Sequence, residues 1–406
     1  MKPGSWGSIW LLYFYSILGA AFISILVPLE GNIEHAYHTT PASVGFSISL
    51  ITVCSIFFAT IGGNIIDRIG ARRSLVGTSV FLVLCNVAGF FSTSMFLLDA
   101  VRLLEGIEFV GIIVAAPVLI IGTTSGRRRV QAMTLWSTYT PAGVGLGLLL
   151  AVPFAGTSAW RRTFLVHGAL LAAAASLGWL LPEIPREARG IARRGRPPWS
   201  DYFEIYRQQG PWKLSISYAL LVSIAFGTST VIPAYFARMH HVSIARSSGL
   251  LGAGYLLTIF AGIGGGYLLT RGIRPVLLYI GITLAGMTSG LLLYAPWSSL
   301  PVAIVMVAVW LTSTGAAAAV LMALLPRVLR DPARGGAAMG LLVQITALAN
   351  LLTPPIYLAL LPKGNWLDFV SLILGGWILS LVFLPAWKTD MAAPSLTPLA
   401  CLIHES

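Results

Sequence analysis

The feature that most constrains this chain is a succession of long apolar runs, each separated from the next by a short polar, proline- or glycine-containing break. A helix needs about 20 apolar residues to cross the ~30 Å hydrocarbon core of a bilayer, and most of these runs are long enough. Only 10% of the residues are charged, and the mean hydropathy is +0.83. So few charges cannot cover a water-soluble surface, so the bilayer is the main solvent of the fold.

Dividing the chain at these breaks predicts twelve transmembrane helices. They are expected near residues 7–29, 42–62, 73–93, 96–121, 130–153, 162–181, 213–236, 247–269, 275–294, 299–325, 336–361 and 366–387. The longest polar break, Pro182 to Trp212, is rich in arginine and proline, which favours a solvated linker.

We therefore predict an all-α membrane protein whose two six-helix bundles are related by pseudo-symmetry. The expected division is a first bundle, a linker, a second bundle and a cytoplasmic tail, at residues 1–181, 182–212, 213–388 and 389–406.

The distribution of lysine and arginine predicts the orientation. With the N-terminus placed in the cytoplasm, 20 of the 26 fall on the cytoplasmic side and five on the opposite side, and Arg102 lies inside a span. Loops retained in the cytoplasm collect basic residues, so we expect a multi-pass protein of the cell (inner) membrane with both termini cytoplasmic. The same bias explains the net charge of +12 without a nucleic-acid partner.

The sequence has no pattern typical of an enzyme or a metal site. It lacks a G-x-S-x-G elbow, a phosphate-binding glycine loop with lysine, an H-E-x-x-H motif and a C-x-x-C pair. The loop histidines lack the helical spacing of metal ligands; these are His35, His38, His240 and His241. We expect no catalytic residues, no metal and no cofactor.

Between the second and third predicted helices the chain reads Gly63-Asn-Ile-Ile-Asp67-Arg68-Ile-Gly70-Ala-Arg72-Arg73-Ser-Leu75. This stretch resembles the signature loop of the major facilitator superfamily of secondary transporters, G-x-L-a-D-R-x-G-R-R-x-x-L. Ala71 departs from it at a usually basic position. An ordinary basic loop would explain the arginines but not the spacing of the glycines and the aspartate.

The resemblance implies a conformational latch that holds one arrangement of the two bundles and is released as they rock. Its residues would be Gly63, Asp67, Arg68, Gly70 and Arg72. Glycine allows close helix approach, and an aspartate near a helix end accepts hydrogen bonds from helix N-termini. The loop from Gly266 to Arg274 looks like a worn second copy with Thr270 in place of the aspartate, as expected of an internal repeat.

The fourth predicted helix places charges at membrane depth. Arg102, Glu105 and Gly106 resemble the R-x-x-Q-G motif of the same superfamily, with glutamate in place of glutamine. Buried charges are costly, so these should face a cavity and pair with one another. Steps of three residues put Arg102, Glu105 and Glu108 on one helix face, so the first two can form an ion pair. Glu108 is then free to exchange a proton; a purely structural charge cluster is the alternative.

A further acid and a histidine lie in other spans of the first half. By the resemblance, Glu30 at the end of the first helix meets the substrate or shares protons with Arg102, while a water-exposed loop acid is the alternative. His167 in the sixth helix is expected to be a packing residue rather than a proton carrier.

The second half has no ionisable residue deep in a span, so its expected substrate contacts are neutral. They are Gln344, Asn350, Tyr255, Tyr218 and Trp310. The amides are the strongest of these candidates because a buried amide needs partners, and helix packing is the alternative for the aromatic residues.

The fifth predicted helix is rich in glycine, with Gly143, Gly145 and Gly147 at alternate positions. Pro153 and Gly156 match part of the G-P-x-x-G-G motif of drug and proton antiporters in the superfamily. The glycines indicate tight helix packing but leave import and export undecided.

The leading hypothesis is a monomeric, proton-coupled secondary transporter of a small polar or amphipathic organic molecule. It works by alternating access, with the proton gradient as driving force and export favoured over import. The second hypothesis is an uncoupled facilitator or importer of an anion, in which Arg102 binds the substrate. A remote third is a transporter-like sensor. The expected partners are the small-molecule substrate and the lipid bilayer.

Overall fold

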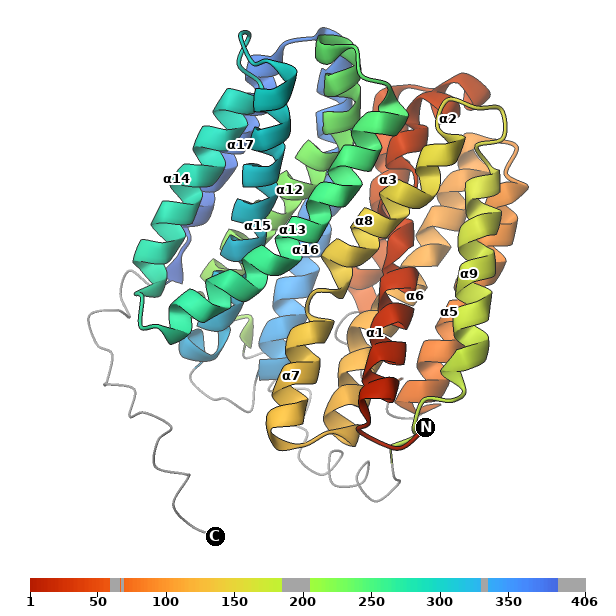
Figure 1. Cartoon of the computed structure of the whole chain (residues 1–406), viewed down its shortest axis with the longest axis vertical. Helices are drawn as coiled ribbons and strands as arrows, with labels where there is room; N and C mark the ends of the chain where they lie inside the picture. Colours follow the sequence, from red (N-terminus) through yellow and green to blue (C-terminus); the bar gives the residue numbers. More distant parts are fainter. Residues whose placement is uncertain (59–65, 67–68, 185–204, 330–334, 386–406) are drawn as a thin grey trace.

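The computed structural model of the chain describes residues 1–58, 66, 69–184, 205–329 and 335–385. All regular structure among these residues is helical (Figure 1). The α-helices of the first half are α1 (Trp6–Ala20), α2 (Glu30–Tyr37), α3 (Pro41–Leu50), α5 (Ala71–Phe90), α6 (Met95–Thr123), α7 (Gly126–Trp136), α8 (Tyr139–Ala151) and α9 (Arg162–Gly178). Those of the second half are α12 (Gln209–His240), α13 (Ile244–Thr270), α14 (Pro275–Leu293), α15 (Leu300–Val328), α16 (Gly335–Leu360) and α17 (Trp366–Val382).

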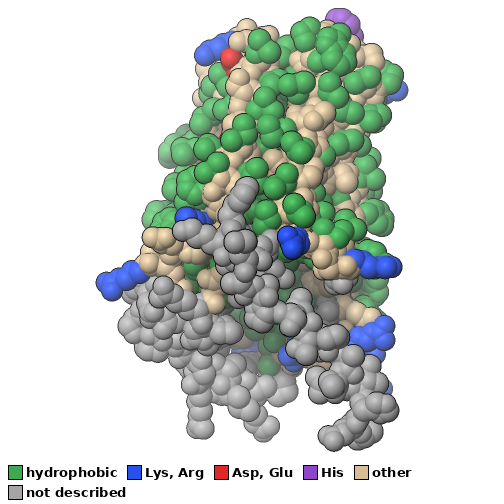
Figure 2. Space-filling model, turned by 90° about the vertical axis from the view of Figure 1, so that its left-hand side faces the viewer, with side chains coloured by type: hydrophobic (Ala, Val, Ile, Leu, Met, Phe, Trp, Pro, Cys, Tyr) green, Lys and Arg blue, Asp and Glu red, His purple; other side chains and the backbone are tan. Residues whose placement is uncertain are grey.

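Within the described residues, ten helical segments are long and apolar enough to cross a membrane. Two shorter apolar helices, α9 and α17, bring the number to the twelve spans expected from the sequence. Figure 2 shows the face formed by α14 and α17, where hydrophobic side chains form a broad band and most of the visible Lys and Arg lie along the lower border. An apolar exterior of this kind suits lipid.

The first span is broken, whereas the sequence predicted one helix over 7–29. After α1 ends at Ala20, the chain forms two short 3-10 turns, η1 (Ala21–Ile23) and η2 (Val27–Leu29), before α2 begins. Close packing of α8 accompanies the break: a Cβ added at Gly147 would collide with the carbonyl oxygen of Ala21. The Ser24 hydroxyl donates to the Val144 carbonyl at 2.7 Å. Trp6–Tyr37 is still long and apolar enough to cross a membrane, so the predicted span is confirmed. The sequence does not indicate the break because the break depends on contacts with a distant helix.

The fifth span is also divided, into α7 and α8, where the sequence predicted one helix over 130–153. The break lies at Ser137 and Thr138, three residues before Pro141. A proline lacks an N–H donor and its ring clashes with the preceding turn, so a helix tends to end just before it.

Two pairs of helices join the halves: α3 packs against α16, and α8 packs against α13 (Figure 1). Both contacts are close enough to involve backbone atoms. A Cβ added at Gly45 would lie 2.7 Å from the Pro354 carbonyl oxygen, and one added at Gly145 would lie 2.8 Å from that of Gly252. The alternate glycines of α8 therefore allow it to pack closely against two neighbours. Gly147 packs against the broken first span, and Gly145 packs against the second half.

We predict that Gly147→Ala destabilises the protein by about 1–3 kcal/mol, because the added methyl group meets backbone atoms that cannot yield easily. Unfolding of the purified protein in detergent, followed by circular dichroism, measures the effect. Gly281→Ala is the matched control, since a Cβ at that helical glycine has no neighbour within 4 Å. Equal stability of the two variants would contradict the packing described for α8.

Candidate functional site

Three charged side chains of α6 are enclosed in the interior of the first half. Arg102 and Glu108 have no exposed surface and Glu105 is 1% exposed. The ion pair expected from their spacing is present between Arg102 Nη1 and Glu105 Oε2. Because an unpaired charge is very costly away from water, this pair allows both groups to be buried at membrane depth. In this conformation helices surround the charges, which do not face open space.

Arg102 also caps the broken first span. Its Nη1 donates to the Phe22 carbonyl oxygen at 3.1 Å, and its guanidinium lies 5.6 Å from the centre of the Phe22 ring. Its Nε donates to the Ser47 carbonyl of α3 at 3.3 Å. A broken helix leaves carbonyl groups without intrahelical donors, and no water is available in hydrocarbon to satisfy them. Arg102 therefore links α6, α3 and the break after α1.

Glu108 differs from Glu105 in having no ion pair with any of the described residues. The Ser79 hydroxyl of α5 donates to its Oε1, and Thr78 faces the same carboxyl group. A Cβ added at Gly19 of α1 would lie 3.3 Å from that Oε1. Glu108 thus occupies a polar pocket between α1, α5 and α6, held by neutral groups rather than by a cation.

No sequence pattern predicts Ser79 or the Phe22 carbonyl as partners of these charges. The same is true of Ser47, whose hydroxyl donates to Asp99 Oδ1 one turn before Arg102. Serine is common in apolar helices and these serines follow no spacing pattern, so the sequence offered no signal for them.

Glu30 lies at the first residue of α2 and is 8% exposed. Its charged neighbours are Glu34 and Arg238, and the latter comes from α12 in the second half. Arg238 Nη1 in turn donates to the Leu361 carbonyl oxygen at 2.6 Å. The structure therefore places Glu30 at a contact between the halves.

Gln344 is engaged at both ends of its amide. Its Nε2 donates to the Ile56 carbonyl at 3.1 Å, which joins the halves, and its Oε1 accepts from the Tyr206 hydroxyl just before α12. The Tyr255 hydroxyl is 2.7 Å from Ser229 Oγ on α12. Gln344 therefore contacts the first half, whereas the Tyr255 hydroxyl is bonded within the second half.

The other three proposed substrate contacts differ in burial. Trp310 has no exposed surface and packs edge-to-face on Trp377, with 6.0 Å between ring centres. Asn350 Oδ1 is buried with no hydrogen-bond partner among the described residues, and Tyr218 is half-buried. Trp310 has the contacts of a packing residue, and Asn350 keeps a free acceptor.

Three latch residues, Gly63, Asp67 and Arg68, lie outside the described residues. Gly70 precedes α5 with a φ of 102°, a conformation that favours glycine. Arg72 pairs with Glu183, with 2.6 Å between Nη2 and Oε1. Its Nη1 donates to the Leu181 carbonyl at 3.0 Å, so Arg72 ties the start of α5 to the segment after α9.

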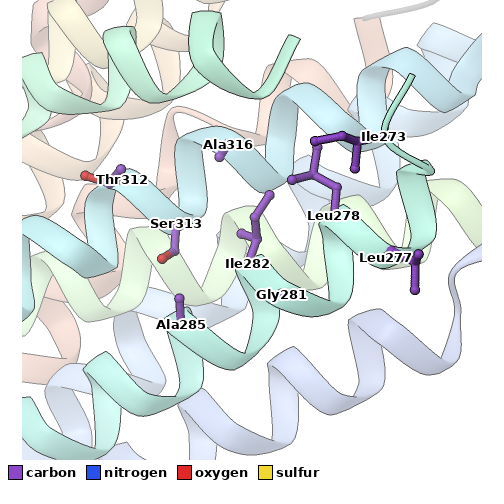
Figure 3. A pocket seen from close by; sticks show the side chains of 9 residues that line it. All are labelled: Ile273, Leu277, Leu278, Gly281, Ile282, Ala285, Thr312, Ser313 and Ala316. Carbon is purple, nitrogen blue, oxygen red and sulfur yellow. The ribbon is translucent and has the colours of Figure 1, made fainter. Parts of the chain in front are cut away.

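A shallow apolar groove lies elsewhere, over α14 and α15 (Figure 3). Its lining is Ile273, Leu277, Leu278, Gly281, Ile282, Ala285, Thr312, Ser313 and Ala316. No charged side chain lines this groove, whereas the buried ion pair of Arg102 and Glu105 lies in the first half.

The twelve apolar helices of the described residues, the broken first span and the buried ion pair beside the break are features expected of a secondary transporter. Comparison with known sequences agrees with this class. A profile of the Major Facilitator Superfamily matches residues 9–354, and the chain belongs to this superfamily. The resemblance inferred from the loop after the second helix is thereby confirmed, and the family consists of transporters rather than enzymes.

Solved structures confirm the fold. The chain is similar to a bacterial homologue of the human lysosomal transporter Spinster, solved in an inward-facing and unoccupied conformation, with a TM-score of 0.80 and 15% identity. That alignment covers 97% of this chain and all of the other. The inward-facing, occupied form of such a homologue gives a TM-score of 0.69 with 16% identity, and 93% of each chain is covered.

A curated relative is the multidrug efflux protein YfmO of Bacillus subtilis (strain 168), 24% identical over 185 residues. The match covers 45% of this chain and 46% of the relative, so it spans about half the length of each protein.

We predict that Arg102→Met destabilises the protein by about 3–5 kcal/mol, because it leaves the Glu105 carboxylate buried without its cation. Adding Glu105→Gln should restore part of that loss, since the second change removes the unpaired charge. Unfolding in detergent measures the stability of the single variant and of the double variant. Arg73→Met is the control because the Arg73 side chain is 64% exposed. If the double variant were no more stable than Arg102→Met, the two residues would not be an energetic pair.

Proposed function

We propose that the protein exports a small polar or amphipathic organic molecule in exchange for protons. The observation that carries this proposal is the carboxyl group of Glu108, buried without an ion pair while Arg102 neutralises Glu105. A carboxyl group can stay in such a place as the neutral acid and release its proton when that side opens to water. Proton transfer at Glu108 then leaves the structural pair intact.

The contacts between the halves support alternating access. If both termini are cytoplasmic, as the basic residues suggest, then Gly45 and Pro354 lie in the outer half of the membrane. The same holds for Gly145 and Gly252, so these two contacts would close the outer side of the path between the halves. Residues 1–181 and 213–388 would rock as two bodies around the linker and reopen this path.

Efflux as the direction of transport is supported by the relative named as a multidrug efflux protein. In the proposed mechanism, residues of the second half such as Asn350 and Tyr255 contact the substrate, and the first half carries the proton. Gln344 and Tyr218 would take part as the halves separate, and Glu30 would exchange protons at the outer contact. We place the protein in the cell (inner) membrane, working as a monomer.

A second candidate is an uncoupled facilitator for an anion. It is favoured by Arg102 Nη2, which is buried and has no hydrogen-bond partner among the described residues. A guanidinium with a free donor can bind a carboxylate or phosphate group.

We predict that Glu108→Gln abolishes the pH change that accompanies transport, because the amide cannot carry a proton. A thermal-shift screen of metabolites, antibiotics and chelators first finds a ligand, and proteoliposomes with an internal pH dye then report its transport. Glu105→Gln should also weaken coupling. Asp368→Asn is the control, since this carboxylate lies in the first turn of α17, away from the cluster. Transport that proceeds equally fast with and without a proton gradient would favour the facilitator.

We further predict that a disulfide across α8 and α13 arrests transport. A Cβ added at Gly252 lies 3.3 Å from Leu148 Cβ, close to the separation in disulfides, so the pair Leu148→Cys and Gly252→Cys should oxidise readily. Cys54, Cys85 and Cys401 are replaced by serine beforehand. Oxidation should lower the transport rate at least tenfold, and dithiothreitol should restore it. The single cysteine variants are the controls. Full transport through the oxidised pair would rule out separation of these helices.

A further inference from the structure

His167 is a buried histidine that the proposed mechanism does not use. It lies on α9 with no exposed surface, where α9 meets α1 and α5. Its Nε2 is 2.9 Å from the Leu18 carbonyl oxygen, and its Nδ1 is 2.9 Å from Asn86 Oδ1. Asn86 Nδ2 donates in turn to the Leu82 carbonyl oxygen at 2.9 Å. Four groups thus form one chain of contacts across three helices.

The positions along this chain are fixed by close packing. A Cβ added at Gly168 would lie 3.1 Å from Asn86 Cβ, so α9 and α5 approach closely beside the histidine. A Cβ added at Gly89 would likewise lie 3.0 Å from the Phe164 ring. The imidazole and the amide therefore have little room to turn away from one another.

The hydrogen-bond partners determine the protonation state of the imidazole. This series of hydrogen-bonded groups ends on the carbonyl oxygens of Leu82 and Leu18, and a carbonyl oxygen can only accept. Asn86 supplies a donor to the first of them, so its Oδ1 faces the ring and needs a donor as well. Both ring nitrogens must then donate, and only the imidazolium has two N–H groups. Turning the amide around would instead set two oxygens against each other at Leu82.

We propose that His167 is a proton-binding site of this transporter, and that its charged form ties α9 and α5 to the broken first span. The link ends at a structurally sensitive place, because the Leu18 carbonyl also accepts from the N–H of Ala21, where α1 gives way to η1. Loss of the proton leaves one ring nitrogen without a hydrogen and breaks one of the two links. The part this plays in transport rests on the proposed function.

The charged groups near the imidazole affect how easily it binds a proton. Burial opposes a cation, and Arg102 on α6 is a like charge that faces the ring. The same interior holds two carboxyl groups: Glu105 and Glu108 both face Cys85, the residue before Asn86 on α5. Glu108 also faces Tyr15 on α1. Once Glu108 has released its proton, Arg102 balances Glu105 and an imidazolium balances Glu108.

Solid-state 15N NMR of full-length protein in lipid vesicles, with ring-labelled histidine and no added ligand, tests the proposal. Comparison with His167→Gln assigns the His167 signals among those of the six histidines. Between pH 5 and 8 we expect two protonated ring nitrogens that are lost together in that variant. His35→Gln removes an exposed imidazole of α2 and should leave these signals unchanged. Asn86→Leu removes one acceptor and should convert the pair to a neutral imidazole signal.

A bare His167 ring nitrogen across the whole pH range would overturn the proposal, as would imidazolium signals that survive Asn86→Leu. Transport provides a separate readout. If the wild-type protein moves protons with substrate, His167→Gln should change the number moved per substrate while Asp368→Asn does not. If the wild type moves none, the proposed function fails, but the nitrogen signals still decide whether His167 binds a proton.

Discussion

The structure depends on the pairing of Arg102 with the broken first span. Helices dominate membrane proteins because each helix satisfies its own backbone, and a break at membrane depth gives up that advantage. The Phe22 carbonyl left by the break is satisfied by Arg102, and the charge of Arg102 is balanced by Glu105. Each element requires the next: the break needs a donor, the donor needs an acid, and the acid must lie one turn away on the same helix.

The glycines of α8 provide the space for this arrangement. A side chain at Gly147 would occupy the position of the carbonyl of Ala21, and one at Gly145 would press on the backbone of the second half. Because the two glycines lie two residues apart, α8 fits between the break and α13 and contacts both. A movement of α13 relative to α8 can therefore reach the charged cluster through a single helix.

The two halves divide the chemistry unequally. The described interior of the first half holds Arg102, Glu105, Glu108 and His167, whereas no Asp, Glu, Lys or Arg is buried among the described residues of the second half. The enclosed polar groups there are mainly hydroxyl, amide and indole groups such as those of Asn350 and Trp310. Charges that change with protonation can alter the links to a broken helix, and neutral groups are better suited to contact a varied organic substrate. In the proposed mechanism, the first half carries the proton and residues of the second half meet the substrate.

The sequence by itself determined the class of fold. Twelve apolar runs allow only membrane-spanning helices, and the glycine, aspartate and arginine spacing after the second helix indicated the family. The i,i+3 spacing of Arg102 and Glu105 was enough to predict their ion pair, because both residues lie on one helix. Local periodicity carries such information whenever the partners share an element.

Only the tertiary structure decided the break after α1 and the partners of Glu108 and His167. Ser79, Asn86 and the carbonyls of Leu18 and Phe22 come from other helices, and no local pattern records which faces of two helices will meet. The same reason separates the candidates in the second half: Gln344 and Trp310 look alike as polar residues in apolar runs, but one links the halves and the other packs against Trp377. Packing between distant helices, which decides these contacts, is a property of the assembled bundle.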